Sequence, residues 1–342
     1  MDIRVTEHAP VDETVRDPVL RVDDIRVQFT AGERTIRAVD GVSFDLGRGE
    51  IFGLVGESGC GKSATLRSLI GLLPPDNART SGHVLYGERD LVGMGERDLR
   101  RMRGAEISMI FQDPMTYLNP VLRVDEQIEE ALKQHTGLDR RARRQRAIEL
   151  MRLVGIPLPE RRLREYPHQF SGGMRQRVLI AIALACSPKI LLADEPTTAL
   201  DVTIQDQILK LLMRLRTELG MSIVLVSHDL GVIVQVCDRV AVMYGGQIVE
   251  TTTTRELIRR PKHPYTVGLL NSVPSITSDA RYLQPIPGAP PSLGNVPSGC
   301  RFHGRCSLGV DECTTWRTEL LDVGNEHAVR CWRHELVETP HV

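Results

Sequence analysis

The feature that most constrains this chain is residues 56–63, with the sequence Gly-Glu-Ser-Gly-Cys-Gly-Lys-Ser. They follow an apolar run, residues 51–55, that predicts a buried strand, and precede residues 64–73, whose apolar side chains recur at helical spacing. Strand, glycine-rich loop and helix in this order match the phosphate-binding pattern G-x-x-x-x-G-K-[ST]. The glycines let successive N–H groups face one concavity at a helix N-terminus, where an anion is stabilised. The segment therefore predicts binding of a nucleoside triphosphate.

The residue types within this loop predict separate roles. Lys62 can place its ammonium group on the β- and γ-phosphates, and the Ser63 hydroxyl can bind Mg²⁺. A glycine-rich turn that matches the pattern by chance is the alternative, and the flanking strand and helix argue against it. The other expected nucleotide contacts of the segment are Gly56, Ser58, Gly59, Cys60, Gly61 and Ala64.

Composition excludes several classes of protein. Of the 342 residues, 41% are hydrophobic and 25% charged, which is ordinary for a globular protein. A chain of this length is expected to hold one large domain with an appendage, or two domains. A net charge of −1 gives no electrostatic indication of nucleic-acid binding. The longest purely apolar run, residues 178–186, is far shorter than the ~20 residues that span a bilayer. Residues 1–16 lack the apolar core of a signal peptide. We therefore expect a cytoplasmic protein with reduced cysteines.

Composition also divides the chain. Residues 1–17 are expected to be a flexible leader, residues 18–253 a nucleotide-binding domain, and residues 254–342, which are rich in proline and cysteine, a C-terminal extension. The predicted fold class is α/β, with a helical subdomain at about residues 115–186. Alternating or continuous apolar residues predict strands at 19–29, 36–39, 42–46, 51–55, 84–86, 107–111, 190–193, 222–226, 240–243 and 247–249.

Later motifs supply the groups that a bound triphosphate would need. Asp194 ends a hydrophobic strand, where its carboxylate can hold Mg²⁺, and Glu195 can polarise an attacking water. Solvated charges at a strand end are the alternative interpretation. His228 follows another predicted strand and can reach the γ-phosphate, although a lone histidine is more often structural. Residues 171–173, Ser-Gly-Gly, open a helix and form a second anion-binding N-terminus. Two half-sites for one nucleotide suggest a dimer in which each serine–glycine segment closes over the partner's ATP.

With these motifs in this order, residues 19–250 resemble the ATP-binding-cassette family. The resemblance implies an ABC-type P-loop NTPase fold, with a RecA-like core, an antiparallel β subdomain and the helical subdomain, and a sandwich dimer that holds two ATP molecules. Residues 56–63 match its Walker A loop and residues 190–194 its Walker B strand. The roles implied for single residues are the Q-loop for Gln112, Mg²⁺ binding for Ser63, Gln112 and Asp194, the catalytic glutamate for Glu195, the D-loop for Asp201, the switch histidine for His228, adenine stacking for Phe29, and the signature for Ser171, Gly172, Gly173 and Met174.

The C-terminal extension indicates which group within this family the chain resembles. Residues 263–266, residues 286–291 and the cysteines from Cys300 on resemble the extension of oligopeptide and dipeptide importer ATPases. The signature, FSGGM where the family pattern is LSGGQ, is similar to their D-type subunit. The resemblance implies an ATPase subunit at the cytoplasmic face of the cell membrane. Its expected partners are a second ATPase subunit, two permease subunits and, indirectly, an extracytoplasmic substrate-binding protein, with no nucleic acid.

Two alternatives to peptide import stay open. Importers of this type also carry nickel chelates, glutathione or sugars, and nothing in the sequence separates these substrates. A soluble cassette ATPase that acts on ribosomes or DNA is a more distant alternative. Such proteins carry two cassettes or a long insertion between the motifs, whereas this chain has one cassette and a compact insertion between Gln112 and Ser171.

Four of the seven cysteines lie beyond residue 299, with the spacing C-x5-C-x6-C-x17-C. Because disulfides are not expected in the cytoplasm, a four-thiolate metal site is the leading interpretation. The spacing does not distinguish zinc from iron–sulfur, and His303 leaves a mixed zinc site open. Peptide-importer ATPases with this extension can carry a [4Fe–4S] cluster, so the resemblance favours the cluster over zinc and over free thiols. The expected ligands are Cys300, Cys306, Cys313 and Cys331.

Overall fold

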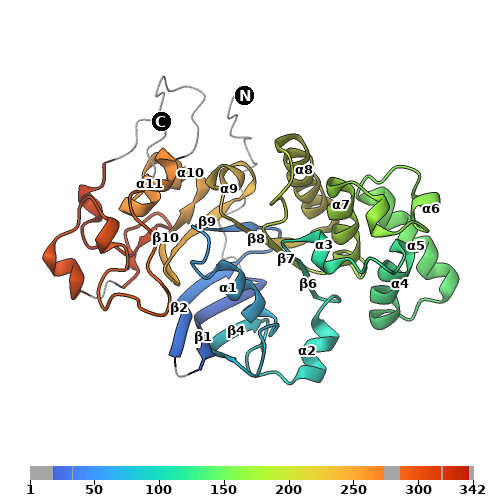
Figure 1. Ribbon diagram of the computed structural model, residues 1–342, viewed down its shortest axis with the longest axis horizontal. Coiled ribbons are helices and arrows are strands. Elements are labelled where there is room, and N and C mark those ends of the chain that lie inside the picture. Colours follow the sequence, from blue (N-terminus) through green and yellow to red (C-terminus); the bar gives the residue numbers. More distant parts are fainter. Residues whose placement is uncertain (1–17, 33, 273–285, 317–318, 339–342) are drawn as a thin grey trace. The chain divides into compact units, whose positions relative to one another are not determined.

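The computed structural model describes residues 18–32, 34–272, 286–316 and 319–338. The leader expected at residues 1–17 lies outside these ranges. Contacts within the chain define two compact units: the first comprises residues 1–47, 51–93 and 226–342, and the second residues 48–50 and 94–225. Both units mix helices and strands, as the predicted α/β class requires (Figure 1).

An antiparallel sheet in the first unit has the strand order β2-β1-β4-β5. The strands predicted at 36–39 and 42–46 are one continuous strand, β2. Gly41, with φ of 77°, takes up the irregular backbone between the two predicted pieces, where β1 and β2 shift register. The bounds are β1 (Leu20–Ala31), β2 (Arg34–Leu46), β4 (Ala78–Tyr86) and β5 (Arg89–Asp90).

The first unit also contains strands in the order β11-β12-β10-β9-β3, of which β3 and β9 are parallel. All five residues of β3 are buried, as the apolar run predicts. The C-terminal extension contributes the two-residue strands β12 and β11, and β12 pairs with β10. The bounds are β3 (Ile51–Val55), β9 (Arg239–Tyr244), β10 (Gln247–Thr253), β11 (Leu321–Asp322) and β12 (Ala328–Val329).

The helices of the first unit include α1, which begins at Lys62 directly after the glycine-rich loop and ends at Leu69, earlier than the prediction of residue 73. Short 3₁₀ helices η2 (His303–Arg305), η3 (Asp311–Thr314) and η4 (His334–Leu336) lie in the extension. The α-helices are α1 (Lys62–Leu69), α9 (Leu230–Val236), α10 (Thr254–Arg259) and α11 (Pro264–Asn271).

The second unit contains strands in the order β8-β7-β6, with β6 and β7 parallel. Strand β6 comprises Ile107–Ile110, β7 comprises Ile190–Asp194, and β8 comprises Ser222–Ser227, of which residues 226 and 227 belong to the first unit. All residues of β6 and β7 are buried.

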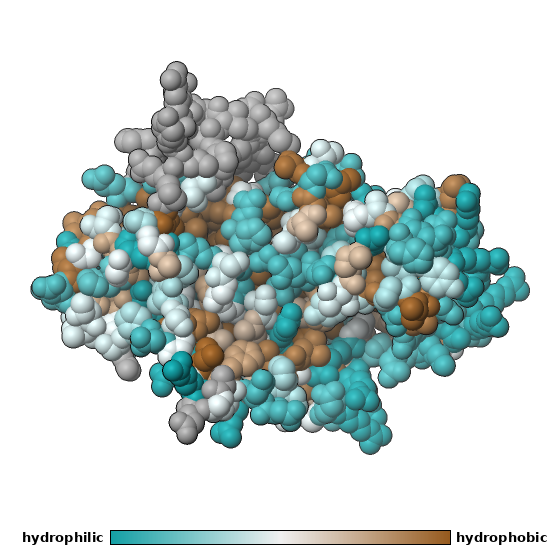
Figure 2. Space-filling view, viewed as in Figure 1, coloured by the Kyte–Doolittle hydropathy of each residue, from teal (hydrophilic) through white to brown (hydrophobic). Residues whose placement is uncertain are grey.

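The helical region of the second unit is a set of separate helices around α7 (Gly172–Ala183). Helix α7 contacts α3, α4 and α5, and its Val178, Ile180 and Ala181 are fully buried. The surface over α4 to α6 is largely hydrophilic (Figures 1 and 2), in agreement with the many arginines of α5. The other helices are α2 (Glu96–Met102), α3 (Pro114–Tyr117), α4 (Val124–His135), α5 (Arg140–Leu153), α6 (Pro159–Arg162), η1 (Pro167–Gln169) and α8 (Val202–Leu219).

None of the helices in the described ranges combines the length and the apolar character needed to cross a membrane.

Candidate nucleotide-binding and hydrolysis site

The glycine-rich loop of the first unit has the geometry that the sequence pattern predicts. Gly61 has φ of 107°, and a Cβ atom there would lie 2.3 Å from the carbonyl oxygen of Ala38, so only glycine fits. Lys62 is 4% exposed, and its ammonium group donates to the carbonyl oxygens of Gly56 at 2.7 Å and Glu57 at 3.0 Å. The N-cap residue of α1 is Gly61, which has no side chain to cap the helix. The positive end of this helix and a buried ammonium therefore converge on one loop, which suits an anion.

The other loop residues differ in exposure. Ser58 and Gly59 are exposed, and Gly61, Ser63 and Ala64 are half-buried. Cys60 is 3% exposed, and burial raises the pKa of its thiol, so that this side chain is a neutral packing group.

In the second unit, β7 positions two carboxylates. Asp194 ends the strand with no exposed surface, and Glu195 follows with 7% exposure. Glu195 has φ of 46°, an uncommon conformation for a residue with a side chain, and such strain is found at functional sites. Its Oε2 atom accepts hydrogen bonds from Gln112 Nε2 at 3.1 Å and Thr198 Oγ1 at 2.8 Å. Gln112 and Glu195 are thus brought together, and Thr198, which sequence analysis did not single out, is a second donor.

The signature segment forms the N-terminus of α7. Ser171 is its N-cap, with a hydroxyl that accepts from the N–H of Met174 at 3.4 Å. Ser171 and Gly172 are exposed, and Gly173 and Met174 are half-buried. A Cβ atom on Gly173 would lie 2.6 Å from Cγ2 of Ile204, so the close approach of α8 requires glycine.

The remaining predicted residues lie at the ends or edges of elements. Asp201 caps α8 by accepting from the N–H of Ile204 at 2.9 Å. In the first unit, Phe29 is half-buried opposite Ile36 in the β1–β2 pairing, and His228 is exposed directly after β8. Adenine stacking by Phe29 and a phosphate contact by His228 stay predictions.

The prediction of a [4Fe–4S] cluster or zinc site on Cys300, Cys306, Cys313 and Cys331 is wrong. Among the described residues, no group of three or more His, Cys, Asp or Glu side chains could hold a metal ion, and the seven cysteines form no disulfide. The fold therefore does not gather these four thiols into a ligand set, which the spacing in the sequence alone could not show. Cys313 is buried and the other three are half-buried, and the backbone carbonyl of Cys313 accepts from the N–H of Cys300 at 2.8 Å.

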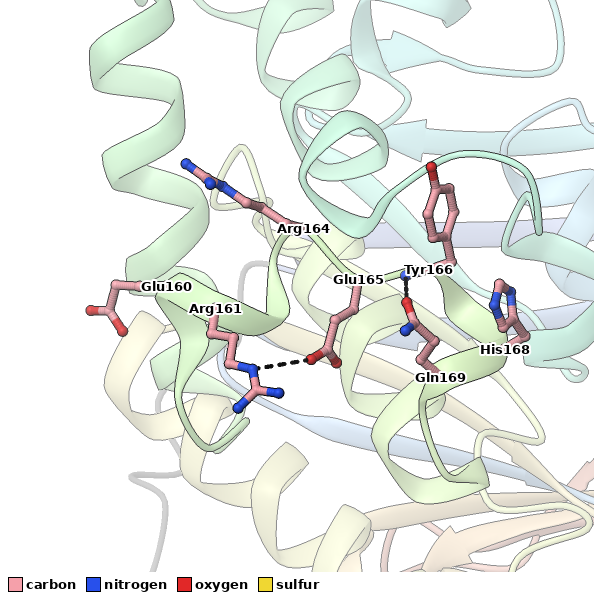
Figure 3. A pocket seen from close by; sticks show the side chains of 7 residues that line it. All are labelled: Glu160, Arg161, Arg164, Glu165, Tyr166, His168 and Gln169. Carbon is pink, nitrogen blue, oxygen red and sulfur yellow. Dashed lines mark hydrogen bonds and ion pairs between the residues drawn. The ribbon is translucent and has the colours of Figure 1, made fainter.

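A polar pocket of about 590 Å³ lies within the second unit and is lined by α6, η1 and the segment between them (Figure 3). Arg161 and Glu165 form an ion pair at 3.9 Å across it, and Gln169 accepts from the N–H of Tyr166 at 2.7 Å. Its lining residues are Glu160, Arg161, Arg164, Glu165, Tyr166, His168 and Gln169.

Comparison with known proteins agrees with this geometry. The family model described as ABC transporter matches residues 39–198, and the model described as the C-terminal region of oligopeptide/dipeptide transporters matches residues 249–313. The chain is 50% identical to the dipeptide transport ATP-binding protein DppD of Bacillus subtilis, over 92% of this chain and 95% of that protein. It is 48% identical to the oligopeptide transport ATP-binding protein OppD of the same organism, over 92% of this chain and 88% of that protein.

The chain belongs to the ABC transporter family. Within it, the chain falls among the ATP-binding proteins of peptide transporters. A solved structure of the ATP-binding cassette MJ0796, described as a dimer in a post-hydrolysis state bound to ADP and phosphate, has a TM-score of 0.62 and 31% identity. The aligned region covers 69% of this chain and 99% of the MJ0796 chain. This ABC ATPase accordingly has the predicted cassette fold and uses ATP and Mg²⁺.

Proposed function

We propose that this ABC ATPase is the ATP-hydrolysing subunit of a membrane importer for dipeptides or oligopeptides. The observation that carries the proposal is the combination of an ABC cassette and a peptide-transporter C-terminal region in one chain. The names of the relatives at 48–50% identity, which match nearly the whole chain, support it. We further propose residues 18–253 as the nucleotide-binding domain and residues 254–342 as the extension.

The geometry supports distinct chemical roles for this chain's residues. Lys62 would bind the β- and γ-phosphates, and its burial makes its charge effective there. Ser63, Gln112 and Asp194 carry the oxygen ligands that suit Mg²⁺, which when bound neutralises phosphate charge.

Glu195 would orient the attacking water and accept its proton, because the donors Gln112 and Thr198 fix the direction of its carboxylate. His228 would contact the γ-phosphate from the end of β8.

The exposed signature supports action on a partner's nucleotide. Ser171 and Gly172 lie at the surface at the N-terminus of α7, where they can contact an anion on another molecule. A dimeric state is described for the related cassette of known structure. We infer a heterodimer with a second ATPase subunit, in which this chain's signature residues 171–174 close over the partner's ATP.

The second unit offers a surface for the membrane subunits. The segment from α6 to α7 carries the polar pocket of Figure 3, and Gln112, which contacts Glu195, could relay nucleotide state to that region. We propose that two permease subunits dock on this helical region, so that the chain is a peripheral subunit at the cytoplasmic face of the cell membrane. On the opposite side of the membrane, a substrate-binding protein would deliver the solute to the permeases.

The test is transport by the assembled importer. The chain is purified together with a candidate partner ATPase and two candidate permease subunits, and the complex is placed in liposomes with a substrate-binding protein. We expect ATP-dependent uptake of a radiolabelled dipeptide or oligopeptide, and its loss with Lys62→Ala. Uptake of nickel chelate or glutathione in place of peptides would change the assigned substrate, and a complex that hydrolyses ATP without transporting any of these would contradict the proposal.

A further inference from the structure

The C-terminal extension reaches the glycine-rich loop through one ion pair within the first unit. Arg305, in η2, donates from Nη1 to Oε2 of Glu57 at 2.7 Å and from Nη2 to Oε1 at 3.0 Å. Glu57 is the second residue of the loop. The pair is bidentate, the strong geometry for guanidinium and carboxylate, and the Arg305 side chain is only 7% exposed. The loop carboxylate is therefore matched by a cation that lies 248 residues further along the chain.

Arg305 is itself held in place by neighbouring groups. Its Nε atom donates to the carbonyl oxygen of Pro287 at 2.8 Å, and its Nη2 atom to that of Ile286 at 3.3 Å. Its Nη1 atom also lies 3.3 Å from the hydroxyl of Tyr244, at the end of β9. These contacts fix the plane of the guanidinium. The hydrogen bond to Glu57 is the main reason that the pKa of Arg305 is raised, so the group stays charged.

A second contact from the extension holds the backbone of the same loop residue. The N–H of Glu57 donates to the hydroxyl of Tyr265, in α11, at 2.9 Å. Tyr265 has no exposed surface, and its ring packs against those of Tyr244 at 4.6 Å and Phe302 at 5.4 Å. Both the side chain and the backbone of Glu57 are thus bound by residues outside the loop.

We propose that the extension is a working part of the ATP site, in which Arg305 is a positioning residue that neutralises and holds Glu57. A triphosphate carries several negative charges, and a carboxylate in the loop that binds it would repel them. The guanidinium offsets that repulsion and fixes the start of the loop, while Tyr265 holds its backbone. The inference rests on the proposed binding of ATP by this loop.

The test measures the affinity of the purified full-length chain for a fluorescent ATP analogue with Mg²⁺. In Arg305→Ala the Glu57 carboxylate stays in the loop without its cation, and we expect the Kd to rise about 5- to 10-fold. Glu57→Gln removes the negative charge, and its Kd should stay within about 2-fold of the original chain. The double variant Arg305→Ala/Glu57→Gln should bind nearly as well as Glu57→Gln, because the source of the repulsion is gone.

Two further variants separate neutralisation from folding. Arg305→Lys keeps the charge and should recover most of the affinity, although it loses the bidentate geometry. The matched control is Arg333→Ala, because Arg333 lies in the same extension and donates to the carbonyl of Leu308 at 3.0 Å without reaching the loop. Its Kd should equal that of the original chain.

The outcomes distinguish this inference from the proposed function. An original chain that fails to bind the analogue would overturn the proposed function itself. An original chain that binds while Arg305→Ala binds equally well would overturn only the role of Arg305. A double variant as weak as Arg305→Ala, or an Arg333→Ala as weak as Arg305→Ala, would show that the extension acts through general stability and not through the Glu57 charge.

Discussion

At the scale of single residues, the proposed role of Glu195 in hydrolysis rests on how its carboxylate is oriented. Glu195 is nearly buried, has a left-handed backbone conformation, and receives hydrogen bonds from Gln112 and Thr198 on the same oxygen. A carboxylate held in this way has a fixed orientation, which is what positioning of an attacking water requires.

Replacing this carboxylate should separate binding from chemistry. We expect Glu195→Gln to bind ATP normally but to hydrolyse it about 10²- to 10⁴-fold more slowly in the assembled complex, because an amide cannot take the proton of the water. Lys62→Ala is the contrasting variant, and it should weaken ATP binding itself. Phosphate release and nucleotide binding measured side by side check both expectations. If Glu195→Gln hydrolysed ATP as fast as the original complex, Glu195 would not be the residue that accepts the proton of the water.

The donor that only the structure identified gives a second prediction. Thr198→Val keeps the size of the side chain but removes the hydroxyl that donates to Glu195 at 2.8 Å. We expect kcat to fall about 10-fold with KM for ATP unchanged, since one hydrogen bond that orients the carboxylate is lost and no nucleotide contact is removed. A change in KM alone would indicate that Thr198 acts on binding instead.

At the scale of elements, the start of the extension is built on buried polar groups. Glu250 of β10, with no exposed surface, accepts from the backbone N–H groups of Lys262 at 2.6 Å and His263 at 2.9 Å. Its Oε1 atom also lies 2.7 Å from Nε2 of His327. His263 then caps α11, because its Nδ1 atom accepts from the N–H of Tyr265 at 3.1 Å. This strand therefore anchors both α11 and the later extension.

The cap makes the stability of the first unit sensitive to pH. Burial, with a smaller effect of the Arg330 charge, lowers the pKa of His263 to about 3 from 6.5. Between these values the unfolded chain binds a proton at His263 that the folded chain does not. Stability from this group is therefore complete above pH 6.5 and is lost as the pH falls toward 3. From pH 7 to pH 5 it should cost about 2 kcal/mol of the free energy of unfolding.

The matched variant is His263→Asn, whose amide oxygen can cap α11 without titrating. Urea unfolding at pH 7 and pH 5 should show that this variant loses about 2 kcal/mol less than the original chain. Equal losses in the two proteins would show that His263 does not titrate as its burial requires.

At the scale of the whole molecule, hydrolysis is expected to be a property of an assembly. Ser171 and Gly172 are exposed at the N-terminus of α7, and the chain already has one phosphate-binding loop of its own. The signature therefore suits a second nucleotide, bound by a partner.

The variant Ser171→Ala tests whether the signature of this chain acts on the nucleotide bound by the partner. We expect ATP affinity at the loop of this chain to change little, while turnover at the partner's site falls at least about 10-fold. Because Ser171 also caps α7, the variant loses about 1 kcal/mol of helix stabilisation. Asp139→Ala is the control, since it removes the cap of α5, where Asp139 accepts from the N–H of Ala142 at 2.8 Å. If the two variants changed turnover equally, Ser171 would act only as the structural cap of α7.

The sequence by itself determined the features that depend on neighbouring residues. The order strand, glycine-rich loop and helix, the carboxylates at the end of β7, and the helix opened by residues 171–173 follow from local spacing and residue type, and the structure has them where predicted. Backbone conformation and helix initiation are set within a few residues, so that a linear pattern is sufficient.

Only the tertiary structure decided the features that join distant parts of the chain. The pairing of Arg305 with Glu57 spans 248 residues and that of Gln112 with Glu195 spans 83, and no spacing in the sequence indicates either. The two-residue strands β11 and β12 have no periodicity of their own and exist because β10 offers an edge for pairing. The cysteines were misjudged for the same reason, because the packed fold, and not the spacing between cysteines, decides whether several thiols lie close enough to share a metal ion.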